Sequence, residues 1–294
     1  MKQPLGFNDN SGRVCLLKKG LYGLKQAPRA WNDKFHEFLS SYGLERSSAD
    51  PCVYVSDKEG YIILGIYVDD GLLCCSSKTT KDKMINEMNK KFEIKVGMPN
   101  CFVGLQVQRN REEGVILVHQ QGYIERILED FGMSSCKPAV TPGESNVVMT
   151  HAMSPENQEE KDRMSKFPYR QAIGKLMFLM HGSRPDIAFE VGRLAQFLNN
   201  PGEEHWKRVK RILRYLRGTS NLCLKFGNIE GKASQEKDIV SLKGYCDSDY
   251  AGDHDTRKST SGIIFTINRS PVSWSSKLQS IIAKSSTEAI CISI

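Results

Sequence analysis

The 294-residue sequence predicts an α+β fold, because two kinds of local pattern alternate along it. Short runs of β-branched and other apolar residues, bounded by turn residues, are typical of strands, and residues 61–75 form the clearest example. Apolar residues repeated every three or four positions are typical of a helix with one buried face, as in residues 205–216. A composition of 39% hydrophobic and 26% charged residues excludes a wholly disordered chain.

The N-terminal part of the sequence predicts a hairpin between two helices. Pro28 suits the first turn of a helix, and Trp31 and Phe35 follow it at helical spacing. Farther along, an apolar run stops at Asp69-Asp70-Gly71 and then resumes, as in a hairpin with carboxylates at its tip. We expect strands over residues 14–17, 52–55, 61–68 and 72–75, and helices from residue 28 onward and over residues 78–92.

The rest of the sequence predicts a helical region followed by a strand-rich end. A helix over residues 169–198 is expected to be interrupted before Pro185, because the residue before a proline avoids the helical region. Residues 137–165 and 218–238 are expected to be loops, and Ser286 or Thr287 is expected to cap a final helix. The other expected elements are a hairpin over 102–107 and 115–118, helices over 123–131 and 205–216, and strands over 240–246, 262–267 and 272–274.

Several protein classes are disfavoured by simple features of the sequence. The longest apolar run, residues 62–68, is far shorter than the ~20 residues that a membrane span needs. The first residues lack the apolar core of a signal peptide. Nine cysteines include no CxxC pair, which argues against a zinc site and favours a reducing compartment. We therefore expect a protein that is neither membrane-bound nor secreted.

Asp69 and Asp70 are the residues most indicative of chemistry. Reactions of phosphodiesters and nucleoside triphosphates use hard cations, which take oxygen ligands from carboxylates and from substrate phosphates. Two such ions, ~3.5–4 Å apart, can clamp the attacking and leaving oxygens of a displacement. Because neighbouring residues of a strand point to opposite faces, we expect one of these carboxylates to act with a carboxylate from elsewhere. The alternative is that Asp69-Asp70-Gly71 is simply a good hairpin turn.

A second feature is the basic face of the helix expected over residues 205–216. The chain has 41 Lys and Arg against 34 Asp and Glu, a formal charge of +7, and residues 206–217 contain no acidic residue. Such a face can be merely solvated, or it can contact phosphates in a sequence-independent and salt-sensitive way. The four side chains expected opposite the apolar stripe are Lys207, Lys210, Arg211 and Arg214.

Together, several of these segments resemble one family. Tyr67-Val68-Asp69-Asp70 resembles the catalytic hairpin of reverse transcriptases, and residues 17–31 resemble the substrate-side loop and helix of copia-type (Pseudoviridae-like) retrotransposon Pol polyproteins. Six further stretches match that family in its own order, so the resemblance covers essentially the whole chain. They are Phe102-Val103-Gly104-Leu105, Tyr169-Arg170-Gln171-Ala172-Ile173-Gly174, Arg184-Pro185-Asp186, Arg214-Tyr215-Leu216-Arg217-Gly218-Thr219, Tyr245-Cys246-Asp247-Ser248-Asp249-Tyr250-Ala251-Gly252 and Ser285-Ser286-Thr287-Glu288-Ala289.

The resemblance implies an RNA-directed DNA polymerase with a ribonuclease H tail. It divides the α+β chain into a C-terminal part of the reverse transcriptase palm (residues 1–108), a thumb-like region (109–145), a connection region (146–237) and a truncated ribonuclease H-like sheet (238–294). It also implies Mg²⁺ or Mn²⁺ as cofactor. The implied partners are an RNA template, a DNA primer, an RNA–DNA hybrid, deoxynucleoside triphosphates and the rest of the Pol polyprotein, in the cytoplasm or in a virus-like particle.

By the same resemblance, individual residues receive roles. Asp69 and Asp70 would be catalytic metal ligands of the polymerase, and Tyr67 would lie near the template–primer end. Gln26 would contact the incoming nucleotide or the template, although helix entry is its alternative role, as core packing is for Trp31. The remaining residues implied to shape or contact the nucleic-acid and nucleotide site are Gly23, Pro28 and Gly104.

Asp247 and Glu288 match the first two catalytic and metal-binding carboxylates of ribonuclease H. The residues themselves agree, because Asp247 is expected to end a strand and Glu288 to begin a helix, so both could reach one ion. Nearby Asp249, Asp253 and His254 are expected to be solvated surface residues.

The resemblance also implies ligands that this sequence lacks. The family uses a further carboxylate upstream of the matched region, and ribonuclease H uses a third carboxylate and a histidine beyond the matched Ser285–Ala289 stretch. We therefore expect the chain alone to be inactive and to work within a complete polyprotein. The alternative is a non-catalytic retrotransposon remnant that at most binds nucleic acid.

Overall fold

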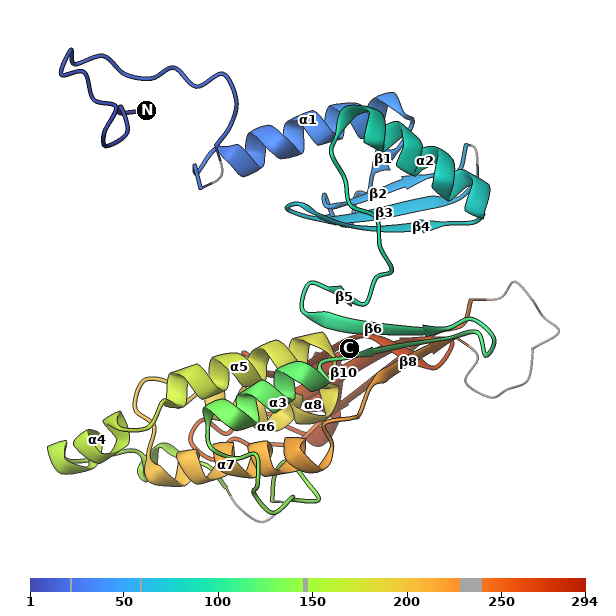
Figure 1. The fold of residues 1–294 in the computed structure, drawn as a ribbon. Helices are drawn as coiled ribbons and strands as arrows, with labels where there is room; N and C mark the ends of the chain where they lie inside the picture. Colours follow the sequence, from blue (N-terminus) through green and yellow to red (C-terminus); the bar gives the residue numbers. More distant parts are fainter. Residues whose placement is uncertain (22, 59, 145–147, 228–239) are drawn as a thin grey trace. The chain divides into compact units, whose positions relative to one another are not determined.

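The computed structural model describes residues 1–21, 23–58, 60–144, 148–227 and 240–294 (Figure 1). The chain forms two compact units, Met1–Pro99 and Asn100–Ile294, which are described separately. Both combine helices with antiparallel strands, so the predicted α+β class is confirmed. Among the described residues, no helix is long and apolar enough to span a bilayer.

Unit 1 packs two helices on one face of a four-stranded sheet (Figure 1). Ile62 and Leu64 alternate with the exposed Ile63 along the third strand, so only one face of the sheet is apolar and buried. Phe38 and Met84, one from each helix, pack in the same cluster as these strand residues. The elements are α1 (Ala27–Ser41), β1 (Glu45–Arg46), β2 (Val53–Ser56), β3 (Ile62–Tyr67), β4 (Asp70–Cys75) and α2 (Lys78–Lys91), with strand order β1-β2-β3-β4.

One predicted element of unit 1 is wrong. Residues 14–17 form no strand, and the side chains of Val14 and Leu16 are exposed. A strand needs a row of hydrogen bonds to a neighbouring strand, but in this segment only Cys15 exchanges backbone hydrogen bonds with another part of the described chain, at Met1. The helix beginning near Pro28, the three strands up to residue 75 and the helix from residue 78 are confirmed within a few residues.

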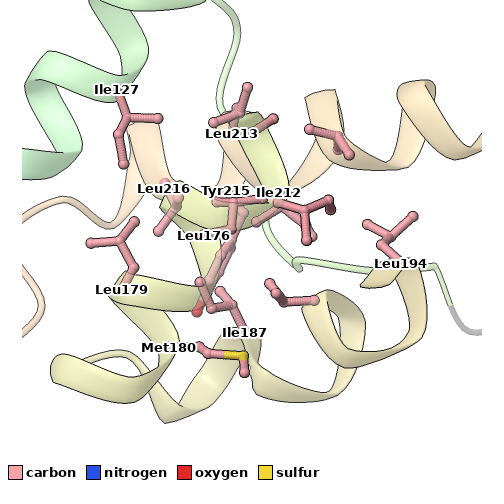
Figure 2. Packing of buried hydrophobic residues seen from close by; sticks show 14 of the residues in the cluster. Ile127, Leu176, Leu179, Met180, Ile187, Leu194, Ile212, Leu213, Tyr215 and Leu216 are labelled. Carbon is pink, nitrogen blue, oxygen red and sulfur yellow. The ribbon is translucent and has the colours of Figure 1, made fainter. Parts of the chain in front are cut away.

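Unit 2 contains the larger hydrophobic core, which lies among four helices. Ile127, Leu176, Leu194 and Leu213, each from a different helix, converge in Figure 2 and are almost completely buried. Residues spaced every three or four positions along each helix supply this core, as the sequence predicted. The helices of the unit are α3 (Gln121–Asp130), η1 (His151–Met153), α4 (Gln158–Ser165), α5 (Tyr169–Gly182), η2 (Pro185–Ile187), α6 (Ala188–Ala195), α7 (Glu203–Gly218) and α8 (Ser286–Ser293).

Two antiparallel sheets complete unit 2. The first has the order β5-β6-β7-β8, and the second has the order β11-β10-β9 with α8 packed against β9 and β10. The indole Nε1–H of Trp274 in the second sheet donates to the carbonyl oxygen of Met180 at 2.6 Å, which ties this sheet to the helical core. The strands are β5 (Cys101–Phe102), β6 (Leu105–Asn110), β7 (Val115–His119), β8 (Leu224–Gly227), β9 (Leu242–Ser248), β10 (Thr260–Ile267) and β11 (Ser270–Leu278).

Three expectations for unit 2 need correction. The predicted loop over residues 137–165 contains η1 and α4; Asn157 caps α4 by accepting a hydrogen bond from the Glu160 amide, but only Met164 of this helix is buried. The predicted loop over 218–238 contains β8, because this segment pairs with β7, which lies far away in the sequence. Residues 228–238 of the predicted loop lie outside the described residues. Ser285, rather than Ser286 or Thr287, caps α8.

The predicted domain roles stay predictions. The chain divides after Pro99, whereas the predicted end of the palm, residue 108, lies inside β6. The predicted thumb, connection and ribonuclease H segments all belong to unit 2.

Candidate active-site hairpin

The tip of the β3–β4 hairpin is a tight turn of two residues. Tyr67 pairs with Asp70, which leaves only Val68 and Asp69 between the strands. Val68 has a φ of 56°, whereas Asp69 is not among the residues with positive φ, and this combination defines a type II′ turn. Positive φ is unfavourable for a β-branched residue, so surrounding contacts must stabilise this turn.

The side chains at this tip are available to a ligand. Tyr67 is 56% exposed, and Asp69 and Asp70 are also exposed. Neither carboxylate has a hydrogen-bond or ion-pair partner in the described part of the chain. Because Asp69 lies in the turn while Asp70 begins β4, the alternation of a regular strand does not fix their relative directions.

Two free carboxylates suit a hard cation but do not complete its coordination. Mg²⁺ requires six oxygen ligands and usually keeps several waters or substrate phosphates among them. The described residues contain no group of three or more His, Cys, Asp or Glu side chains that could bind a metal. The hairpin therefore offers part of a metal site.

Trp31 connects helix α1 to the turn, a contact that the sequence did not reveal. Its indole Nε1–H donates a 2.9 Å hydrogen bond to the carbonyl oxygen of Val68. Its ring also stacks on Phe35 and meets Phe92 edge-on, with ring centroids 5.3 Å apart in both pairs. The aromatic spacing along α1 indicated the packing, but the hydrogen bond depends on a hairpin that lies 37 positions farther along the chain.

The loop before α1 places the predicted nucleotide-contacting residues at the start of that helix. Gln26 occupies the N-cap position, makes no capping hydrogen bond with its side chain and is exposed. Gly23 has a φ of +90°, which favours glycine, and Pro28 lies in the first turn of the helix, where its missing N–H costs nothing. The exposed side chain of Gln26 agrees with a contact to substrate, which stays a prediction.

Gly104 lies in a second two-residue turn, between β5 and β6. Phe102 pairs with Leu105, and Val103 and Gly104 have φ values of 51° and 77°, the pattern of a type I′ turn. A Cβ atom on Gly104 would lie 2.8 Å from Cζ of Phe178, a residue of α5. Turn geometry and close packing both explain this glycine, and its nucleic-acid contact remains a prediction.

Asp247 and Glu288 lie on neighbouring elements, as the sequence predicted. Asp247 is the penultimate residue of β9 and is exposed; its Oδ1 accepts a 2.8 Å hydrogen bond from the amide of Ser248. Glu288 lies in the first turn of α8, which packs against β9. Its Oε2 accepts a 2.6 Å hydrogen bond from the amide of Lys284, while its own amide donates to Ser285 Oγ. One oxygen of Glu288 therefore already stabilises the helix start.

Most of the basic side chains predicted to contact nucleic acid have partners within the chain. Arg211 donates 2.6 and 2.9 Å hydrogen bonds to Glu144 and Thr141, and Arg214 donates a 2.8 Å bond to the carbonyl oxygen of Lys137. Arg208 and Arg217 make similar bonds to Glu144 and to the Ser134 carbonyl. These arginines bind residues 134–144 along α7, and hydrogen bonds and charge from Arg208 lower the pKa of Glu144.

Two lysines of α7 differ from these arginines. Lys207 pairs with Glu204 one turn earlier on the same helix, and the Glu204 carboxylate raises the pKa of Lys207. Lys210 is exposed and has no ion-pair or hydrogen-bond partner among the described residues. The sequence could not separate the two groups, because the tertiary fold, and not a local pattern, brings residues 134–144 beside α7.

Comparison with known proteins identifies the family. Residues 1–145 match the family described as reverse transcriptase (RNA-dependent DNA polymerase). The chain is 33% identical to a putative transposon Ty5-1 protein of Saccharomyces cerevisiae, over 98% of this chain and 91% of that protein. The chain belongs to the reverse transcriptase family of copia-type retrotransposon Pol proteins.

Two plant relatives show how much of a Pol polyprotein this family member spans. It is 44% identical to the retrovirus-related Pol polyprotein from transposon TNT 1-94 of Nicotiana tabacum, over 98% of the chain and 22% of the relative. It is 37% identical to the Pol polyprotein from transposon RE1 of Arabidopsis thaliana, over 98% of the chain and 19% of the relative. The chain thus spans about a fifth of these relatives, and no solved structure matches it.

A further stretch that matched the family, Arg184-Pro185-Asp186, forms a buried ion-pair network. The guanidinium of Arg184, only 1% exposed, donates to both oxygens of Asp186 and to the carbonyl and hydroxyl oxygens of Thr219, at 2.7–3.3 Å. The Tyr215 hydroxyl donates to Asp186 at 2.8 Å. Burial alone would raise the pKa of Asp186, but hydrogen bonds and charge from Arg184 outweigh it and lower that pKa. This motif therefore joins η2 to the end of α7.

Proposed function

We propose that this chain carries the catalytic hairpin of an RNA-directed DNA polymerase and acts within a complete Pol polyprotein. The observation that carries the proposal is the tip of the β3–β4 hairpin. There, Asp69 lies in a constrained turn and Asp70 directly follows it, and both are exposed and have no partner among the described residues, in a chain of the reverse transcriptase family. Solvated carboxylates without a structural partner are expected where a cation binds.

In this proposal, Asp69 and Asp70 hold Mg²⁺ or Mn²⁺ together with at least one acidic side chain from elsewhere in the polyprotein. The metal ions would orient the triphosphate of a deoxynucleoside triphosphate and stabilise the charge that develops during nucleotidyl transfer. Tyr67, beside the turn, would face the end of the DNA primer on its RNA template. Gln26 would contact the incoming nucleotide or the template from the start of α1.

The same proposal gives the end of unit 2 a ribonuclease H role. Asp247 on β9 and Glu288 on α8 would supply two carboxylates for Mg²⁺-dependent cleavage of the RNA in an RNA–DNA hybrid. The packing of α8 on β9 supports this assignment, because it keeps the two elements adjacent. The polyprotein would work in the cytoplasm or inside a virus-like particle.

A second candidate function is nucleic-acid binding without catalysis, as in a retrotransposon remnant. The formal charge of +7 favours it, as does the exposed Lys210 on α7, which has no partner within the described ranges. Binding of this kind depends on phosphate contacts and weakens as salt rises.

Primer extension on poly(rA)–oligo(dT) with Mg²⁺ or Mn²⁺, by a complete Pol polyprotein that contains this chain, tests the first candidate. Asp69→Asn should reduce extension to the level without protein, because the amide is a poor ligand for a hard cation. Asp82→Asn is the matched control, since Asp82 is an exposed aspartate of α2 whose one ion pair in the described part of the chain is with its neighbour Lys81. Extension that survives Asp69→Asn contradicts the proposal.

Hybrid binding measured at low and moderate salt separates the two candidates. No extension by the complete polyprotein with this chain unaltered, combined with salt-sensitive binding that Lys210→Ala weakens, supports the second candidate. If there is no primer extension and no hybrid binding, both candidate functions are contradicted.

A further inference from the structure

The orientation of one peptide group decides the geometry of the Val68–Asp69 turn. Types I′ and II′ both begin with a residue at positive φ, and they differ in the direction of the central peptide group. In type I′ the second residue also has positive φ, whereas in type II′ it does not. Here the central carbonyl is that of Val68, which is the acceptor of the Trp31 indole N–H.

The residues of the turn do not select this form by themselves. Type II′ favours glycine at its first position, but valine occupies it, and a strained φ of this kind costs ~1–3 kcal/mol. Aspartate at the second position tolerates positive φ, so a type I′ turn is also accessible. The chain shows that alternative in its other Val-first turn, Val103-Gly104, where both φ values are positive.

The indole that donates to the Val68 carbonyl is itself fixed in place. Trp31 is half-buried, stacked on Phe35 and in edge contact with Phe92, whose rings also pack against Phe38. Phe35 and Phe38 are part of the core of unit 1. An indole held on two sides in this way keeps its N–H directed at one point.

We infer that Trp31 is a positioning residue: by binding the Val68 carbonyl, it locks the turn in the form that sets the backbone direction of Asp69. Loss of the N–H lets the central peptide flip, which changes the sign of φ at Asp69 and moves its carboxylate. The effect on catalysis rests on the proposed function, but the effect on the turn does not.

Nuclear magnetic resonance of the full chain tests the inference without any polymerase activity. When the central peptide flips to type I′, the amide protons of Val68 and Asp69 come close together, whereas type II′ separates them. Their cross-peak should be weak in the unaltered chain and strong in Trp31→Phe. Trp274→Phe is the matched control, because it removes an indole hydrogen bond to a carbonyl, that of Met180, in unit 2. A weak cross-peak in both variants overturns the inference.

Rescue distinguishes positioning from packing. Glycine at position 68 favours type II′ without help, so Trp31→Phe combined with Val68→Gly should restore the weak cross-peak. If Trp31 acted only through packing, Val68→Gly would not restore it, and that result also overturns the inference. Should Trp31→Phe fail to fold, replacement of Trp31 by 3-benzothienylalanine keeps the ring shape and exchanges the N–H for sulfur.

Primer extension by the complete polyprotein then links the turn to the proposed function. We expect the kcat of Trp31→Phe to fall and to recover in the double variant, with Trp274→Phe unchanged. A kcat that stays unchanged while the turn flips would overturn the catalytic part of the inference. If the complete polyprotein with this chain unaltered extends no primer, the proposed function fails, and the resonance experiment still decides whether Trp31 sets the turn.

Discussion

Two stretches that matched the same family, Tyr67–Asp70 in unit 1 and Arg184–Asp186 in unit 2, use charged residues in opposite ways. At the hairpin, both carboxylates are exposed and have no partner in the described part of the chain. In unit 2, Arg184 is 1% exposed, and it binds Asp186 and Thr219 in one network. Charged residues that match a family can therefore be buried in a structural network, as Arg184 is, or stay exposed and available to a ligand, as the two carboxylates do.

The difference also concerns the backbone. The hairpin keeps its side chains free and fixes only a main-chain carbonyl, through Trp31. The Arg184 network fixes side chains and joins η2 to the end of α7. The following predictions test this contrast, from the largest expected effect to the smallest.

Arg184→Met should lower the free energy of unfolding of unit 2 by ~3–5 kcal/mol, because it leaves the carboxylate of Asp186 without its cation. Asp70→Asn, by contrast, should change stability by no more than ~0.5 kcal/mol. Trp206 and Trp274 lie in unit 2, so urea unfolding followed by fluorescence in a Trp31→Phe background measures the effect of Arg184→Met. Trp31 lies in unit 1, so a background with Trp206→Phe and Trp274→Phe measures the effect of Asp70→Asn. An equal effect of both substitutions would remove the contrast.

His205 should make unit 2 less stable as the pH falls. Its ring is buried against Phe197, its Nδ1 accepts a hydrogen bond from the Gly202 amide, and burial lowers its pKa to about 4. Because its unfolded pKa is ~6.5, the unfolded state takes up the proton first as the pH falls. Stability should be constant above pH ~6.5 and decrease by up to ~3 kcal/mol toward pH 4.

Unfolding measured between pH 4 and pH 7.5 checks this prediction. His205→Gln should be less stable at neutral pH and should lose most of the slope. If the pH dependence of stability persists in this variant, it arises from other titratable groups. The charged groups that act on His205 are His151, Asp255 and Glu204.

Gly104→Ala should cost ~1–3 kcal/mol, since a side chain at a φ of 77° is strained and would also press on Phe178. Gly97→Ala is the control, because a Cβ there meets nothing within 4 Å and its φ is not positive. The Val68–Asp69 turn carries a side chain at the equivalent second position. If Gly104→Ala left the free energy of unfolding unchanged, the second position of this turn would accept a side chain as readily as that of the Val68–Asp69 turn. That result would contradict the different φ patterns of the two turns.

The smallest effects should separate Arg211 from Lys210 on α7. Arg211→Ala should cost ~0.2–1 kcal/mol through its lost bonds to Glu144 and Thr141. Lys210→Ala should leave stability unchanged but reduce the salt dependence of hybrid binding by about one counterion. Thermal unfolding and binding at several salt concentrations measure the two effects. The reverse result would show that α7 binds nucleic acid through its arginines.

Local patterns predicted most elements, because they arise from neighbouring residues. The apolar run around Asp69 and Asp70 predicted the hairpin, and the apolar stripe of residues 205–216 predicted α7. The elements that local patterns did not predict are β8 and α4. β8 exists because it pairs with β7, and α4 buries only Met164, so neither has a strong pattern of its own.

The candidate site divides in the same way. The carboxylates and the turn could be predicted from their residue types, and their placement at a hairpin tip is confirmed. The Trp31 hydrogen bond and the arginine contacts to residues 134–144 could not, because they join segments whose approach is set by the tertiary fold. Their chemical roles stay predictions.

The position of β8 has a consequence for synthesis on the ribosome. In unit 1, strands β1 to β4 pair in chain order, so that sheet can close as soon as its residues emerge. In unit 2, β7 must wait for β8, which follows only after α3, α5, α6 and α7. During that interval β7 is an unpaired edge, the kind of surface that invites association between nascent chains. Translation speed between residues 120 and 224 should therefore influence how much unit 2 reaches its native form.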